Sequence, residues 1–201
     1  MKIRLFTKNT TNLRSQFIWP PLFILVAATS NAQITKSHWM IGGVISYAST
    51  NYNSANYGEP HAAYNLQAKP NIGFFVADKF AAGITTLINS SGVKPTGSTG
   101  FNKYTDFNIG PFVRYYLLPT ENRTNILAET MYQIGYEKGN QKDPALKNTF
   151  IAAAGPVFYF NNSVGLEMQI SYSTYKFKSI QGFNHTIMFG LGLQVHLENN
   201  Q

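Results

Sequence analysis

Apolar and polar side chains alternate along most of this chain. In HTIMFGLGLQVHL (185–197), every second residue from Ile187 to Leu197 is bulky and apolar, and the residues between them are mostly small or polar. A β-strand points successive side chains to opposite faces. The stretch therefore predicts a strand with one apolar and one mixed face. Seven earlier segments show the same alternation, and no segment after residue 33 has the period of an amphipathic helix. We predict eight strands, at about residues 38–49, 63–76, 80–90, 103–117, 125–137, 147–160, 164–177 and 184–197.

The connections between these segments alternate in length. The short ones lie at residues 77–79, 118–124 and 161–163, and the longer ones at 50–62, 91–102, 138–146 and 178–183. Short turns at one end and longer loops at the other end are typical of outer-membrane β-barrels. An even number of strands then places the beginning and the end of the barrel domain at the short-turn end.

The two faces of the predicted strands favour a closed barrel. One face is apolar, whereas the other carries Lys69, Arg114, Glu129 and Glu167 together with glycines and amides. A soluble core that buried these charges without partners would lose several kcal/mol for each. A closed barrel in a membrane resolves this, because hydrocarbon surrounds the apolar face and the mixed face lines a narrow lumen. We predict an all-β fold, an eight-stranded antiparallel up-and-down transmembrane β-barrel, with a soluble secreted barrel as the main alternative.

Three prolines fall inside the predicted strands. Pro70, Pro111 and Pro156 each lie in a strand that runs toward a short turn. Proline cannot donate a hydrogen bond to a neighbouring strand, and inside sheets it is found at edges and bulges. We therefore predict β-bulges near the short-turn rim at these positions.

The first 32 residues have the order of an export signal. Residues 1–16 are basic and polar, residues 17–28 are apolar, and TSNAQ follows with small residues before a cut ahead of Gln33. This order is typical of a secretory signal peptide. The apolar run is shorter than a membrane-spanning helix needs, and it holds two adjacent prolines. We predict a signal peptide at 1–32 and an exported barrel domain at 33–201.

Composition narrows the possible functions. The formal charge is +7, but four of the sixteen basic residues precede residue 33, where there is no acidic residue. The rest of the chain has no basic run, so nucleic-acid binding has little support. The chain has no cysteine, which excludes disulfides, thiol nucleophiles and thiolate metal sites. We expect no cofactor.

Several stretches resemble a known group of proteins. They are PNIGFFVADKFAAGI (70–84), IGPFVRYYL (109–117), AGPVFYFNNSVGLEMQISY (154–172) and the terminal GLGLQVHL (190–197). The chain resembles the small outer-membrane β-barrel proteins, often labelled porin-like, of Gram-negative bacteria. The resemblance implies a monomer in the cell outer membrane, in contact with its lipid and inserted by the barrel-assembly machinery. Members often end in an aromatic residue, whereas this strand ends in VHL and is followed by ENNQ.

The charged residues of the mixed face form the main candidate site. Arg114 and Glu129 fall on adjacent predicted strands and both point inward, as do Lys69 and Glu167. We predict an internal ion-pair network that plugs the lumen, because eight strands enclose only a narrow interior. An ion or solute pathway is the alternative. The sequence thus favours a structural or narrow porin-like barrel without catalytic activity.

The long loop at 50–62 supports a second interpretation. Tyr52, Tyr57 and His61 in this loop are candidates for contact with an external partner, as in a binding or adhesion barrel. Exposed polar loops are usually only solvated, so this interpretation ranks below the first.

A lipid-modifying enzyme is the weakest interpretation. His185 lies near the outer rim, with Ser171 and Ser173 on the preceding strand, and such residues can form a hydrolase triad. No acidic residue is placed to orient His185. The chain has four histidines, His38, His61, His185 and His196. We expect them at loop or rim positions, and no two of them have the spacing of metal ligands on one strand.

Overall fold

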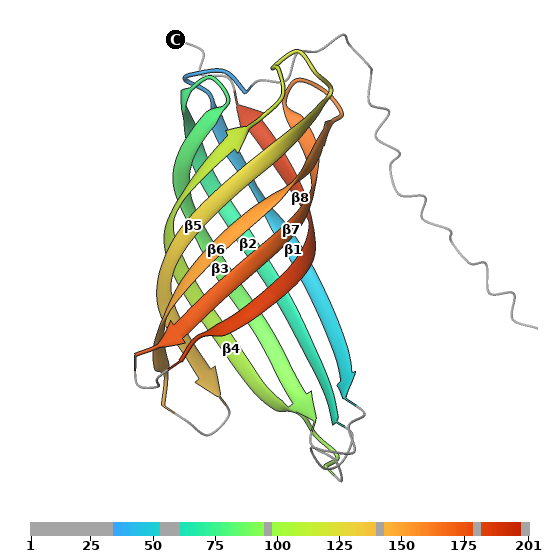
Figure 1. Ribbon diagram of the computed structural model, residues 1–201, viewed down its shortest axis with the longest axis vertical. Coiled ribbons are helices and arrows are strands. Elements are labelled where there is room, and N and C mark those ends of the chain that lie inside the picture. The colour runs from blue at the N-terminus through green and yellow to red at the C-terminus, as the bar shows by residue number, and fades with distance from the viewer. Residues whose placement is uncertain (1–33, 53–60, 95–97, 140–142, 179–181, 198–201) are drawn as a thin grey trace, which may run out of the picture.

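The computed structural model describes residues 34–52, 61–94, 98–139, 143–178 and 182–197, and these form one closed antiparallel barrel (Figure 1). The described strands follow one another around the barrel in chain order, and the last pairs back with the first. No helix in this part of the chain is long and apolar enough to cross a membrane. The strands are β1 (Trp39–Tyr52), β2 (His61–Ala77), β3 (Phe80–Lys94), β4 (Asn102–Tyr116), β5 (Thr124–Gly139), β6 (Ala145–Tyr159), β7 (Val164–Phe177) and β8 (Asn184–Leu197).

The eight predicted strands are confirmed, and the largest differences lie at the long-loop end. There β1 extends to Tyr52 and β3 to Lys94, beyond the predicted ends at 49 and 90. The residues of these extensions are mostly polar, so the sequence predicts a loop there. They are strand residues because they form backbone hydrogen bonds with a neighbouring strand, which β-propensity alone does not predict. The beginning of β1, the end of β8 and the short turns all lie at the upper end in Figure 1, as predicted.

The two faces separate as the alternation predicts. The outer surface carries a belt of large apolar side chains, among them Ile170, Leu191 and Ile187, the last of which is 73% exposed. Charged and amide side chains such as Arg114 and Gln133 are buried inside. An apolar belt of this extent is far larger than the patches that soluble monomers expose. The outside of the barrel therefore suits hydrocarbon.

Small residues on the inward face make room for large ones. Gly73 of β2 and Gly83 of β3 lie opposite each other, and the ring of Phe112 from β4 occupies the space in front of them. A Cβ added to Gly73 would lie 2.8 Å from Phe112 Cζ and 3.0 Å from Met40 Cγ, closer than carbon atoms pack. The glycines thus allow bulky side chains to fill a narrow barrel.

The prediction of bulges at Pro70, Pro111 and Pro156 was wrong. Strand register is the same before and after each proline. Each ring instead interrupts the pairing with the next strand for two residues and leaves the pairing with the previous strand continuous. Proline removes a donor without adding a residue, so the ladder has a gap and no shift. A register shift lies between Phe75 and Ala77, beside the turn into β3.

The segment before β1 folds over the short-turn end. Ile34 is fully buried in an apolar cluster that includes Phe75 and Tyr116. Its carbonyl accepts a hydrogen bond from the backbone N of Lys79 at 2.8 Å. Lys79 belongs to the two-residue turn between β2 and β3 and has φ of 66°, a left-handed conformation that few side chains adopt. Its Nζ also donates to the carbonyl of Leu117 at 3.1 Å, so contacts on two sides hold the turn.

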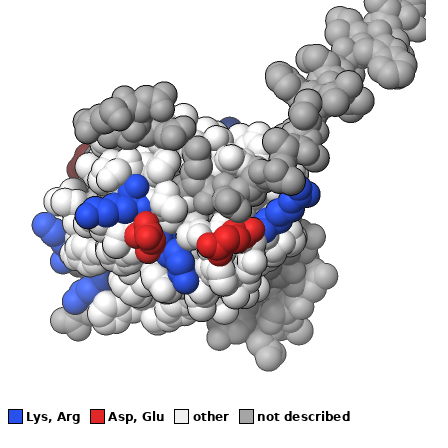
Figure 2. Space-filling model, turned by 90° about the horizontal axis from the view of Figure 1, so that it is seen from above, with Lys and Arg blue, Asp and Glu red and all other residues white. Residues whose placement is uncertain are grey.

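Charged side chains of both signs gather around this end of the barrel (Figure 2). The backbone N of Lys36 donates to Asp78 Oδ1 at 2.8 Å, and Glu121 and Arg123 are exposed in the connection between β4 and β5. The apolar belt therefore gives way to a hydrated rim, as expected where a barrel leaves the hydrocarbon.

Candidate functional site in the barrel interior

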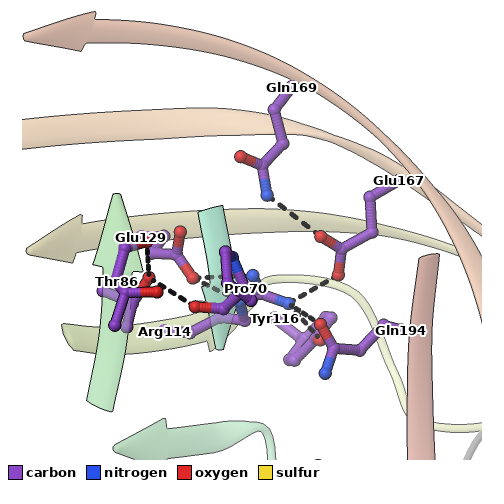
Figure 3. A network of polar contacts seen from close by, with 9 residues as sticks. Pro70, Thr86, Arg114, Tyr116, Glu129, Glu167, Gln169 and Gln194 are labelled. Atoms are coloured by element: carbon purple, nitrogen blue, oxygen red, sulfur yellow. Dashed lines mark hydrogen bonds and ion pairs between the residues drawn. The ribbon is translucent and has the colours of Figure 1, made fainter. Parts of the chain in front are cut away.

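A buried ion-pair network crosses the barrel interior (Figure 3). Arg114 of β4 lies at its centre and is 1% exposed. Its Nη2 lies 2.6 Å from Glu129 Oε2, and its Nε donates to the same oxygen at 2.7 Å. Its Nη1 lies 2.5 Å from Glu167 Oε1. Arg114 thus bridges a carboxylate of β5 and a carboxylate of β7 with the short bonds typical of charged partners.

Neutral side chains complete the network. Arg114 Nη1 also donates to the Tyr116 hydroxyl at 3.3 Å and to Gln194 Oε1 at 3.2 Å. Gln169 Nε2 donates to Glu167 Oε2 at 3.0 Å, so both oxygens of this carboxylate accept a hydrogen bond. Buried ion pairs persist when additional hydrogen bonds satisfy their remaining polar atoms, and this arrangement provides such bonds.

Lys69 points into the same lumen but stands apart from these ion pairs. It is buried, and its Nζ makes no hydrogen bond with any residue that the structure describes. The formal charges of Lys69, Arg114, Glu129 and Glu167 add up to zero. Of the four residues selected from the sequence, all are inside and three are joined directly.

Strand pairing and barrel closure bring these groups together in different ways. Arg114 and Glu129 are direct cross-strand partners in β4 and β5, and their inward direction follows from the alternation. Glu167 belongs to β7, which does not pair with β4. It reaches Arg114 because the sheet closes on itself and its inward side chains meet across the lumen.

An aromatic layer lies between this network and the short-turn end. His196 is 1% exposed, and its ring centre is 5.2 Å from that of Phe75 and 5.8 Å from that of Tyr159. Phe75 and Tyr116 lie 6.0 Å apart. The expectation that every histidine occupies a loop or rim was wrong for His196. His196 is the last inward-facing residue of β8, so its ring points into the barrel.

A second charged cluster, not anticipated from the sequence, lies nearer the long loops. Lys147 Nζ of β6 lies 2.7 Å from Asp106 Oδ2 of β4 and 3.6 Å from Glu137 Oε2 of β5. Asn89 Nδ2 of β3 donates to Asp106 Oδ2 at 3.0 Å, and Lys147 Nζ lies 4.8 Å from the ring centre of Tyr175. Applying the two-residue alternation to β6 would have identified Lys147 as an inward residue.

The structure does not assemble the hydrolase triad considered for His185. The Nδ1 atom of His185 lies 2.6 Å from the hydroxyl of Tyr172, on the exposed side of the barrel. The hydroxyls of Ser171 and Ser173 turn the other way and lie near backbone carbonyls of β8. The serines and the histidine are therefore on opposite faces of the sheet.

Of the three loop residues selected for partner binding, one falls outside the described structure. Tyr52 and His61 are backbone partners at the ends of β1 and β2, and Tyr57 lies outside the described residues. Binding through this loop stays a prediction. Among the described residues, no group of three His, Asp or Glu side chains could hold a metal ion.

Comparison with known proteins identifies the fold. No protein-family model and no curated protein matches the sequence of the chain. The barrel is similar to the crystal structure of Neisserial surface protein A (NspA), with a TM-score of 0.52 and 9% identity over 79% of this chain and 96% of that one. It is also similar to the outer membrane protein OprG from Pseudomonas aeruginosa, with a TM-score of 0.52 and 12% identity over 85% and 100% of the two chains. At these identities the likeness concerns the fold, which is that of the small outer-membrane β-barrels, and the resemblance drawn from the sequence is confirmed at that level.

Proposed function

We propose that this protein is a monomeric structural barrel of the cell outer membrane, without catalytic activity, whose lumen the Arg114 network closes. The observation that carries the proposal is the bridge from Arg114 to Glu129 and Glu167, because it reaches from the paired strands β4 and β5 to β7, which pairs with neither of them. Such a bridge occupies the centre of a lumen that eight strands keep narrow.

The outer surface supports the membrane location. Its large apolar side chains are exposed on all eight strands, and a charged rim follows at the short-turn end (Figure 2). Closure pairs every strand with two neighbours, so no strand edge meets hydrocarbon unpaired. We propose that outer-membrane lipid surrounds this belt and that the barrel-assembly machinery inserts the chain.

Two layers support a closed lumen. The Arg114 network crosses the lumen, and the rings of Phe75, Tyr116, Tyr159 and His196 pack between it and the short-turn end. A hydrated ion that crosses the barrel would have to separate bridged charges and then displace a packed aromatic layer. Both steps oppose a stable open pore.

Single-channel recording tests this function. The mature chain, residues 33–201, is inserted in planar lipid bilayers, and slower migration of the heated sample on gels verifies that the inserted barrel is folded. We expect no stable, large conductance steps. A steady conductance in every folded preparation would contradict the closed lumen and favour a solute pathway.

We also propose that residues 1–32 are removed on export. Residues 1–33 lie outside the described structure, so this proposal rests on the order of basic, apolar and small residues. The mass of the protein extracted from the outer-membrane fraction should match residues 33–201. A mass that includes the first 32 residues would contradict cleavage.

A further inference from the structure

Between the Arg114 network and the long loops, the lumen holds a polar cavity of about 100 Å³. Strands β2 to β8 all contribute to its wall, which includes the charged cluster of Asp106, Glu137 and Lys147. The cavity is far too small for a sugar or a peptide. It has room for a few waters or for one small ion with part of its hydration shell.

The fully buried polar atoms of this wall that lack a described partner are all oxygens. Asn89, Asp106 and Thr149 are only 4–6% exposed, and Asn89 Oδ1, Asp106 Oδ1 and Thr149 Oγ1 make no hydrogen bond with any residue that the structure describes. Asn65 Oδ1 in the same wall is also without a described partner. Buried polar atoms in proteins nearly always have partners, so these oxygens call for a ligand that offers positive charge or donors.

The orientation of Asn89 is fixed by its neighbour. Its Nδ2 donates to Asp106 Oδ2 at 3.0 Å, so the amide oxygen is the atom that remains available. Lys147 Nζ occupies the same Asp106 oxygen at 2.7 Å and leaves Oδ1 free for another partner. The acceptors come from β3, β4 and β6, three separate positions around one hollow.

The charges of the wall select the class of ligand. Asp106 and Glu137 outnumber Lys147, so the formal charge of the cluster is −1. None of the fully buried nitrogens of the wall lacks a partner among the described residues, which disfavours an anion. Calcium usually takes six to eight oxygen ligands, including several carboxylates, and Lys147 already occupies part of the acidic group. We propose that this cavity binds a monovalent cation, ammonium or an alkali ion, through Asp106, Asn89 and Thr149.

Titration of the folded mature barrel in detergent micelles or nanodiscs tests the site. Backbone amides are followed by NMR while N-methyl-D-glucamine chloride is replaced by ammonium chloride or potassium chloride at constant ionic strength. We expect saturable shifts around Asn89, Asp106 and Thr149 with at least one of these two cations. The more tightly bound of the two identifies the ion. Shifts that never saturate, or that appear only with Mg²⁺, would overturn the proposal.

Four substitutions make the test specific. Thr149→Val removes the hydroxyl at nearly constant volume and should weaken binding about tenfold, the effect of one lost bond to a charged group, whereas Thr149→Ser should retain it. Asp106→Asn should abolish saturable binding. Asp143→Asn removes an exposed carboxylate before β6 and is the charge-matched control. Unchanged binding in Thr149→Val and in folded Asp106→Asn would refute the site; if Asp106→Asn does not fold, Thr149→Val alone decides.

Discussion

Arg114 and Glu167 are separated by 53 residues in sequence, yet Arg114 Nη1 lies 2.5 Å from Glu167 Oε1 inside the barrel. Their strands, β4 and β7, do not pair with each other. The contact therefore ties two arcs of the barrel wall together across the lumen. It gives the interior a fixed cross-link in addition to the backbone ladder.

Removing the centre of this network should destabilise the barrel. Arg114→Met leaves two buried carboxylates without their cation, and the expected loss is about 3–5 kcal/mol in the free energy of unfolding. Neutralising the partners as well, with Glu129→Gln and Glu167→Gln, should restore most of it. Urea unfolding followed by the fluorescence of Trp39, the one tryptophan after residue 33, measures the change. Exposed Arg123→Met is the control, and an equal loss there would contradict the role assigned to the network.

Filling the space beside Phe112 should also destabilise the barrel. Gly73→Ala places a methyl group against the Phe112 and Met40 side chains, and overpacking of this kind costs about 1–3 kcal/mol. In the background of Phe112→Leu the same substitution should cost less, because the ring that it meets is gone. A double-mutant cycle in urea measures this coupling. Equal costs in both backgrounds would refute the steric explanation.

Charge on the outer belt should act according to depth. Ile170 lies in the middle of β7 and points outward, so Ile170→Arg should lower the stability of the barrel in lipid vesicles by about 2–4 kcal/mol. Leu117→Arg, just after β4 at the short-turn rim, should cost about 0–1 kcal/mol. If the two variants were equally stable in vesicles, the outer belt would not be in hydrocarbon.

The segment before β1 should contribute to stability. Ile34 is fully buried in the cluster that closes the short-turn end, and replacing a buried Ile by Ala costs about 2–5 kcal/mol. Ile34→Ala is therefore expected to lower the urea midpoint clearly, whereas exposed Lys36→Ala should leave it nearly unchanged. A midpoint for Ile34→Ala equal to that of the unmodified barrel would mean that this segment is not docked in solution.

The alternation of apolar and polar residues predicted most of the fold, because every second side chain of a strand lies on the same face and suits the surroundings of that face. It gave the strands, the closure and the inward direction of Arg114 and Glu129. Glu167 could be placed inside but not against Arg114, since that contact depends on how a closed sheet curves. Residues at strand ends were harder to place: Lys94 continues β3 only because Ala62 of β2 pairs with it.

The other differences between the predicted and the observed structure can each be traced to a few residues. The prolines were expected to shift the register, but a missing donor leaves a gap without an added residue. Ile34 has no strand pattern around it, so its burial at the short-turn end follows from tertiary packing alone. The inward direction of Lys147 could have been predicted, because its side chain lies on the same face of β6 as that of Thr149.

A lipid-covered outer face distinguishes this barrel from a soluble one, and it can be measured directly. The chain has no cysteine, so single cysteines at positions 170 to 173 of β7 can carry a spin label in vesicle-reconstituted protein. Collisions with oxygen, which partitions into lipid, should be frequent at the outward positions of Ile170 and Tyr172 and rare at those of Ser171 and Ser173. If a water-soluble nickel complex reached position 170 as readily as oxygen does, water and not lipid would surround the belt.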